Sequence, residues 1–310
     1  MRRFLIDTDT ASDDAVALVM ALRHADVAVE AITVVSGNVG LDQAVQNALY
    51  TVELCGAEAE VPVHAGAASP MMRSLETAQY VHGEDGMGDA GYPLSGRVPA
   101  EGRGAEVIVE TILGAPGEIT LVALGPLTNL AIAVLLAPEI ADAVDRVVVM
   151  GGTGVHGPGN VSAMAEYNFW ADPEAAAVVS RAGFPIEFVG WDISIASAVV
   201  DADRFEALQA VGTPLSQFAV DISQVVRRFA MENGLAGDDL PDPIAMAHAI
   251  DPSVATTQRL HVDVMVGDGP QRGVMEVDRL GFGGGEPNVD IVTHYPSDHF
   301  FSMLEAALRD

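Results

Sequence analysis

The stretch FLIDTDTASDDAVALVMAL, residues 4–22, joins a short apolar run to a helix-period pattern through four aspartates. Phe4–Asp7 reads as a short strand, whose apolar residues are followed by Asp7 at its carboxyl end. The apolar spacing after it predicts a helix over Asp13–His24, with Ser12 as its N-terminal cap and first-turn carboxylates that suit the helix dipole. A strand followed at once by a helix is the opening of a unit with parallel strands.

The same alternation continues along the chain. Short β-rich runs are found at Phe4–Asp7, Ala28–Val35, Val61–His64, Ile119–Leu124, Arg146–Met150, Ile186–Val189, Leu260–Val266, Gly273–Val277 and Val289–Thr293. Helix-period segments are found at Asp13–His24, Leu41–Leu54, Glu106–Leu113, Leu127–Leu136, Pro173–Ala182, Thr213–Glu232, Pro243–Ile250 and His299–Leu308. This order predicts an α/β fold: an open, mostly parallel, Rossmann-like sheet with helices on both faces and an antiparallel edge near the end of the chain. Without a linker, we expect one domain over residues 1–310.

Composition excludes several classes of function. Asp plus Glu number 44 and Lys plus Arg number 15, so the formal net charge is −29. Nucleic acid phosphates and anionic membrane surfaces would repel such a chain, and neither is an expected partner. All 15 basic residues are Arg, which excludes a lysine Schiff base and a Walker A phosphate loop. With a single cysteine, no signal-peptide pattern and no apolar run of roughly 18–20 residues, we expect a cytoplasmic protein.

The acidic cluster of the opening stretch indicates a metal site. Asp7, Asp9, Asp13 and Asp14 lie within eight residues, at the end of a strand where parallel sheets bind ligands. Four adjacent carboxylates repel one another unless a cation neutralises them. Oxygen ligands select Ca²⁺ or Mg²⁺ over softer metals.

Two families of enzyme have a similar acidic opening. Asp7–Thr8–Asp9–Thr10 resembles the DxDxT motif of haloacid-dehalogenase-like phosphatases, in which the first Asp is the nucleophile. Those enzymes also need a lysine near the phosphate, and this chain has none. The four aspartates match fully the DxDxxxDD signature that opens the inosine-uridine preferring nucleoside hydrolase family.

The resemblance to the nucleoside hydrolases continues in the order of the family's motifs, over roughly residues 4–250. The matching segments are Val35–Val39 (VSGNV), Leu124–Ala133 (LGPLTNLAIA), Met150–Ala177 (MGGTGVHGPGNVSAMAEYNFWADPEAAA) and Asp242–Pro243. Four motifs in the correct order are far more specific than any one of them. The resemblance implies Ca²⁺-dependent hydrolysis of the N-glycosidic bond of ribonucleosides, giving ribose and a free base for salvage.

The resemblance also implies a role for particular residues. The implied Ca²⁺ ligands are Asp9, Asp14, the backbone carbonyl of Leu124 and Asp242. The implied ribose-binding residues are Asp13, Asn38, Asn160, Glu166 and Asn168. Asp9 is the implied general base for a metal-activated water. Carboxylates beside the sugar suit this reaction, because an oxocarbenium-like ribose carries positive charge. We expect an extended segment that turns Glu166 and Asn168 to one side.

The chain departs from the family at one catalytic position. Family members often carry a His directly before the last Asp, where it is thought to protonate the departing base, whereas this chain has Pro241. His82 is our first substitute for that acid and His156 our second. We expect the segment Thr213–Glu232 to wall the base pocket. Its candidate contacts are Arg227, Arg228, Phe229 and Glu232.

The missing acid leaves a further alternative open, a nucleoside-binding protein with weak or no catalysis. The resemblance also implies a homodimer or homotetramer whose partner is a small-molecule ribonucleoside.

Overall fold

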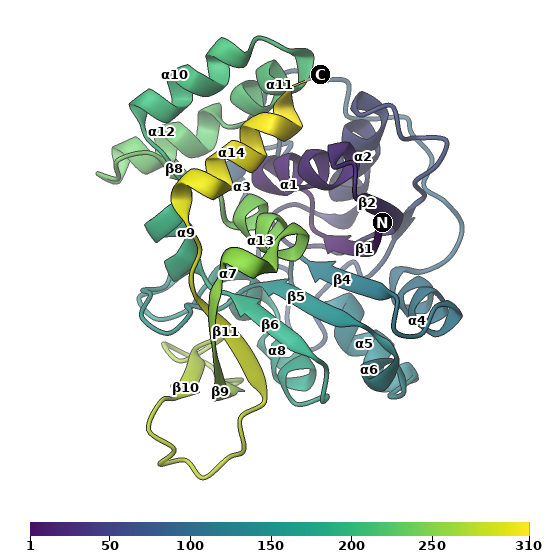
Figure 1. The fold of residues 1–310 in the computed structure, drawn as a ribbon, viewed down its shortest axis with the longest axis vertical. Helices are drawn as coiled ribbons and strands as arrows, with labels where there is room; N and C mark the ends of the chain where they lie inside the picture. Colours follow the sequence, from purple (N-terminus) through teal and green to yellow (C-terminus); the bar gives the residue numbers. More distant parts are fainter. Residues whose placement is uncertain (310) are drawn as a thin grey trace.

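The computed structural model describes residues 1–309, and its centre is a sheet of nine strands in the order β10-β9-β11-β6-β5-β4-β1-β2-β3. The strands are β1 (Arg2–Thr8), β2 (Val27–Val34), β3 (Val63–Ala65), β4 (Ile119–Ala123), β5 (Arg146–Met150), β6 (Ile186–Val189), β9 (Thr256–Val264), β10 (Met275–Asp278) and β11 (Val289–His294). Neighbours from β3 to β11 pair in parallel, whereas β9 pairs antiparallel with both β11 and β10. The predicted α/β fold with an antiparallel edge is confirmed, and each of the nine predicted strands is present (Figure 1).

Helices cover both faces of the sheet. Those of ten residues or more are α1 (Ser12–Arg23), α2 (Leu41–Leu54), α4 (Gly104–Gly114), α10 (Ala202–Val211), α13 (Pro241–Ile250) and α14 (Ser297–Leu308). The shorter ones are α3 (Gln79–His82), α5 (Thr128–Leu136), α6 (Ile140–Ala143), α7 (Tyr167–Ala171), α8 (Pro173–Ser180), α9 (Trp191–Ser197), α11 (Pro214–Ile222) and α12 (Gln224–Glu232). Phe4 and Ile6 of β1 pack with α1, α2, α13 and α14, and Leu5 packs on the other face with α4, α5 and α8. Within residues 1–309 no helix combines the length and apolar content needed to cross a membrane.

The predicted helix over Thr213–Glu232 is wrong, because the structure divides it into α11 and α12 at Ser223. The hydroxyl of Ser223 donates a hydrogen bond to the carbonyl of Val220 at 3.0 Å. Gly88 lies against the carbonyl of Ile222, where a larger side chain would overlap it. The helix is therefore interrupted at Ser223, and α12 begins as a separate helix at Gln224.

The predicted cap at Ser12 is also wrong. The cap position belongs to Ala11, and Ser12 is the first helical residue of α1. The carboxylate of Asp14 reaches back to accept the backbone N–H of Ala11 at 3.0 Å. Ser12 is thereby free to use its hydroxyl elsewhere.

Helix α13 packs along α1, and side chains at its far end hold it in place. Glu187 of β6 contacts His248 Nε2 at 2.5 Å and Arg146 Nε at 3.0 Å. Arg146 also donates to the carbonyl of His248, and the Tyr295 hydroxyl donates to the carbonyl of Ala247. These contacts fix the end of α13 to β5 and β6, so that its first turn faces the first turn of α1.

Candidate active site

The carboxyl ends of the central strands surround a cavity of about 310 Å³. Eight of the residues expected to bind the metal or the sugar or to protonate the base line it: Asp13, Asn38, His82, Leu124, Asn160, Glu166, Asn168 and Asp242. Asp9 and Asp14 are fully buried. Residues that are far apart in the sequence are thus brought together by strands β1, β2, β4 and β5 and by helix α13.

Three carboxylates of this site form a compact acidic group. Asp13, Asp14 and Asp242 each offer an oxygen, and these atoms lie within 4.8 Å of one another. Oxygens Oδ1 of Asp9, Asp13 and Asp242 are enclosed yet have no hydrogen-bond partner among the described residues. Buried oxygens without a donor are costly, and a hard divalent cation is the group that satisfies several of them together.

Burial and mutual repulsion raise the pKa values of the whole group. Burial raises the pKa of Asp13 and of Asp14 to about 6. The pKa values of Asp9 and Asp242 are raised well above the usual range, first by burial and then by the charge of Asp14. Such carboxylates oppose ionisation together unless a cation lies among them, so the donor set fits a bound metal ion.

Asp9 is not part of this compact group, and backbone atoms enclose its carboxylate. Its Oδ2 accepts the N–H of Asn38 at 2.6 Å. Gly37 and Gly125 approach so closely that a Cβ on either would overlap the Asp9 carboxylate. The group within 4.8 Å contains Asp13, which the resemblance implied for the sugar, and does not contain Asp9, which the resemblance implied as a metal ligand.

The residues that resemble a sugar-binding set are built around the start of α7. The Glu166 carboxylate accepts the backbone N–H groups of Gly152 at 2.9 Å and Asn168 at 2.8 Å. Burial nevertheless raises the pKa of Glu166 to about 7. The Asn168 amide donates to the carbonyl of Leu124 at 2.7 Å. The predicted extended segment is wrong, because Glu166 caps α7 and Asn168 is helical, but both side chains still line the cavity.

The loop before α7 carries Asn160, whose Oδ1 accepts the backbone N–H of Tyr167 at 2.8 Å. The same loop carries His156, which is exposed and does not line the cavity. His156 instead contacts Arg279 at 3.1 Å. The structure therefore does not bring our second substitute acid to the site.

His82, our first substitute, is buried at the cavity wall. Its Nδ1 lies 2.8 Å from the Ser12 hydroxyl and 3.7 Å from Asp13 Oδ1. Burial lowers the pKa of His82 to about 4, so the imidazole is neutral at pH 7. In the tautomer whose Nδ1 accepts the Ser12 hydroxyl, Nε2 carries the ring proton.

Helix α12 forms one wall of the cavity, but few of its predicted contacts reach it. Phe229 lines the cavity and meets Tyr80 edge to face, with ring centroids 6.0 Å apart. Arg227 is bound to Asp238 at 2.9 Å and covers the ring of Phe205. Arg227, Arg228 and Glu232 are all missing from the cavity lining, so these three expected contacts are wrong.

Other lining residues were missed by the sequence analysis, among them Tyr80, Tyr167, Trp191 and Asp239. Asp239 belongs to a strand of only two residues, β8 (Asp238–Asp239), which pairs with β7 (Val199–Val200). Neither strand is long enough to show a period. The acidic pair Asp238–Asp239, separated from Pro241 by Leu240 alone, was the available signal.

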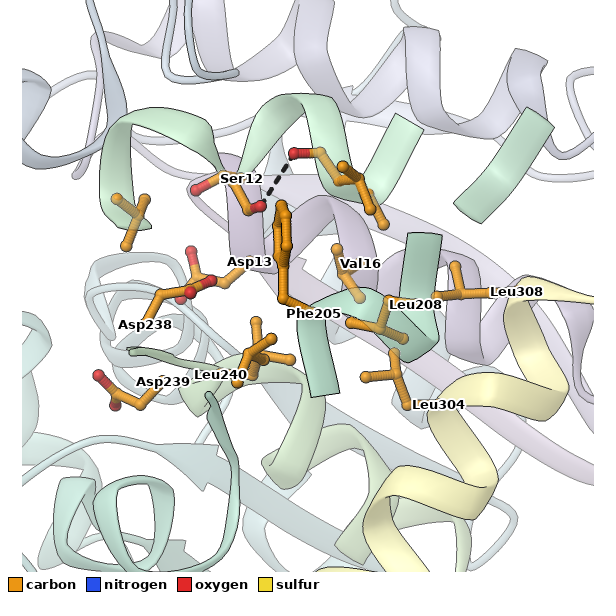
Figure 2. Close-up of a pocket in the computed structure, with 15 residues that line it drawn as sticks. Ser12, Asp13, Val16, Phe205, Leu208, Asp238, Asp239, Leu240, Leu304 and Leu308 are labelled. Atoms are coloured by element: carbon orange, nitrogen blue, oxygen red, sulfur yellow. Dashed lines mark hydrogen bonds between the residues drawn. The ribbon is translucent and has the colours of Figure 1, made fainter. Parts of the chain in front are cut away.

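A second, smaller cavity of about 30 Å³ lies behind this wall, between α1, α10, α11 and α14. Figure 2 shows Asp13, Asp238 and Asp239 at one side of it and the apolar side chains of Leu208, Leu304 and others at the other side. The three aspartates also line the larger cavity, whereas Leu208 and Leu304 line the smaller cavity alone.

Comparison with known proteins identifies the family to which this chain belongs. The sequence profile of the inosine-uridine preferring nucleoside hydrolase family matches residues 4–302. The pyrimidine-specific ribonucleoside hydrolase RihB of Escherichia coli (strain SE11) is 34% identical over 310 residues, covering 99% of this chain and 97% of that protein. The solved structure of a plant nucleoside hydrolase, PpNRh1, has a TM-score of 0.93 at 32% identity and covers 99% of this chain and 98% of its own. An inosine-guanosine nucleoside hydrolase has a TM-score of 0.91 at 31% identity, with 99% of both chains covered.

The chain belongs to the inosine-uridine preferring nucleoside hydrolase family, and it is an enzyme of the nucleoside hydrolase class. The resemblance inferred from the motifs is thereby confirmed. The phosphatase alternative is set aside by this membership, which extends over nearly the whole chain.

The acidic group predicts how stability responds to pH and to Ca²⁺. The folded pKa values of Asp13 and Asp14 are about 6 and that of an unfolded Asp is about 4, so the folded protein binds more protons between these values. Without metal, the protein should become more stable as pH falls from 7.5 to 5. At pH 7.5, saturating Ca²⁺ should raise Tm by at least about 4 °C.

Thermal unfolding in EDTA and in CaCl₂ at both pH values measures these effects. Asp242→Asn removes one repelling charge, so it should raise Tm in EDTA and diminish the Ca²⁺ shift. Equal Tm values with and without Ca²⁺ at pH 7.5 would contradict an ion site in this group.

Proposed function

We propose that this protein hydrolyses the N-glycosidic bond of ribonucleosides to ribose and a free base, with Ca²⁺ as its metal ion. The observation that carries the proposal is the single cavity in which sugar-recognising side chains adjoin unpaired buried carboxylates. RihB and the inosine-guanosine nucleoside hydrolase, which are similar over nearly the full chain, support the reaction class by their names.

The ribose would be bound by the carboxylates and amides along the sheet edge. These residues are Asp13, Asn38, Asn160, Glu166 and Asn168. Carboxylates accept hydroxyl protons and amides can both donate and accept, so the set matches the alternating hydroxyls of a sugar. Glu166 and Asn168 are fixed by backbone contacts, which orients them before the substrate arrives.

Asp9, Asp14, Asp242 and the carbonyl of Leu124 would hold the Ca²⁺, which supplies positive charge that lowers the pKa of a nearby water molecule. Asp13 is close enough to adjoin the same ion. Asp9 would accept the proton of the attacking water, because its Oδ1 is unpaired and its pKa is raised. The ring of carboxylates stabilises the positive charge of an oxocarbenium-like ribose as the base departs.

His82 would assist departure by donating a hydrogen bond to the base. Its cavity position and its bond to Ser12 support this role, which the neutral imidazole can perform through Nε2. We further propose a cytoplasmic homodimer or homotetramer built of one domain per chain, on the strength of the family resemblance.

Release of reducing sugar from a panel of purine and pyrimidine ribonucleosides tests the proposed reaction. We expect turnover that thorough chelation abolishes and Ca²⁺ restores. Asp9→Ala should reduce turnover to background, because it removes both an ion ligand and the proposed base. Asp298→Ala, at a highly exposed carboxylate, is the matched control and should retain activity. A wild-type protein that binds nucleosides but releases no sugar would establish the binding-protein alternative instead.

Ribose recognition should dominate over base recognition. A 2′-deoxynucleoside leaves Asp13 and the ion without a hydroxyl partner, and an unpaired buried polar group costs about 1–3 kcal/mol. We therefore expect kcat/KM to fall by at least about tenfold from uridine to 2′-deoxyuridine and from inosine to 2′-deoxyinosine. Equal efficiencies within either pair would refute the assignment of Asp13 to the sugar.

His82→Ala should slow the hydrolysis of nucleosides whose base is a poor leaving group. Assistance by a proton donor contributes roughly 10²–10⁴-fold, so we expect at least the lower loss with inosine and uridine. p-Nitrophenyl riboside should be nearly unaffected, since nitrophenolate leaves without a proton. Small and equal effects on all three substrates would remove His82 from the mechanism.

A further inference from the structure

Asp239 is a cavity residue to which the proposed reaction gives no role. Its Oδ2 accepts hydrogen bonds from Trp191 Nε1 at 2.7 Å and from the Ser194 hydroxyl at 2.5 Å. Both donors belong to α9, so two contacts from one helix fix the orientation of the carboxylate. A carboxylate oriented in this way is prepared to bind a partner with its other oxygen.

That other oxygen, Oδ1, has no side-chain partner among the described residues. Asp239 as a residue is partly exposed, whereas Asp242 is buried. Figure 2 shows the carboxylate of Asp239 pointing away from the apolar side chains of Leu240 and Leu304, and Asp239 lines the larger cavity. The free oxygen is therefore available to a molecule bound in that cavity.

The other carboxylates of the cavity lining already have partners or assignments. Asp238 is bound to Arg227 at 2.9 Å, and Glu166 accepts backbone N–H groups at the sugar side. Asp13 and Asp242 belong to the acidic group described above. Asp239 is the remaining carboxylate of the lining. It lies on β8, which contacts α12, the helix that contributes Phe229. Pro241, which follows closely in the chain, lines the same wall and offers no polar side-chain atom.

We propose that Asp239 Oδ1 accepts a hydrogen bond from an N–H or amino group of the nucleobase, which makes Asp239 a specificity-determining residue. This inference rests on the proposed function. The ligands favoured are nucleosides whose base presents a donor on its edge, such as inosine and adenosine. Purine riboside, which has the same ring system without that donor, is disfavoured.

The surroundings of Asp239 support an acceptor. Burial raises the pKa of Asp239 above its ordinary value, and the hydrogen bonds donated by Ser194 and Trp191 oppose that rise. An ionised carboxylate only accepts hydrogen bonds. A site built to bind a donor also discriminates against an analogue that lacks it, because its own polar atom then stays unpaired. Trp191 and Ser194 act as positioning residues for this contact.

The test compares kcat/KM for inosine, adenosine, purine riboside and p-nitrophenyl riboside in wild-type and Asp239→Asn enzymes. In the variant, the amide oxygen can keep the two bonds from α9, and the NH₂ group then faces the base. We expect kcat/KM for inosine and adenosine to fall at least about tenfold relative to purine riboside, with p-nitrophenyl riboside unchanged. Asp298→Asn is the matched control and should leave every ratio unchanged.

Three results would overturn the inference: an unchanged inosine to purine riboside ratio, an equal loss on all nucleosides, or an equal loss on p-nitrophenyl riboside. If Asp239→Asn fails to fold, Ser194→Ala removes one orienting bond and should lower the same ratio by a smaller factor. Failure of the proposed function is a separate result, since the wild-type enzyme would then release no ribose. In that case the ratio of binding affinities for inosine and purine riboside, in wild-type and variant, decides the role of Asp239.

Discussion

Repulsion among buried carboxylates is the constraint on which the rest of this structure depends. Asp9, Asp14 and Asp242 are enclosed at one edge of the sheet, with Asp13 beside them, and their raised pKa values measure how strongly the fold opposes their charges. The helix dipole of α1, the N–H of Asn38 and the contacts that anchor α13 all hold these groups in place. Such an arrangement opposes stability in the absence of a cation, which is why it marks a candidate functional site.

The cavity has two sides that are built differently. The side proposed to bind the sugar consists of strand ends and backbone-bonded residues such as Glu166 and Asn168. The opposite side consists of short elements, α3, α12 and β8, that pack around Phe229. Relatives with the same fold are named for pyrimidine or for inosine and guanosine specificity. Base preference is therefore expected to vary on the second side while the sheet edge stays the same.

Most of the fold could be predicted because consecutive apolar residues such as Ile119–Leu124 identify buried parallel strands. The sheet order then explains why Asp13, Asn38 and Asp242 meet, although Leu124 has no side-chain signal and came from motif resemblance alone. The break at Ser223 lies beside Gly88, and the Glu166 carboxylate that caps α7 also accepts the N–H of Gly152. No local pattern contains these two tertiary contacts. Asp239 was missed because two residues cannot show a period, and its meaning depends on the α9 side chains that orient it.

The docking of α13 on α1 has a consequence for how the enzyme is made. Strand β1 is synthesised first but lies in the middle of the sheet, between β2 and β4, and its acidic edge is completed only by Asp242. A nascent chain therefore carries an incomplete acidic group until most of its length has left the ribosome. A product truncated before Pro241 would lack both the closing carboxylate and the helix that covers it. An ion held by these carboxylates would therefore need residues both from α1, near the start of the chain, and from α13.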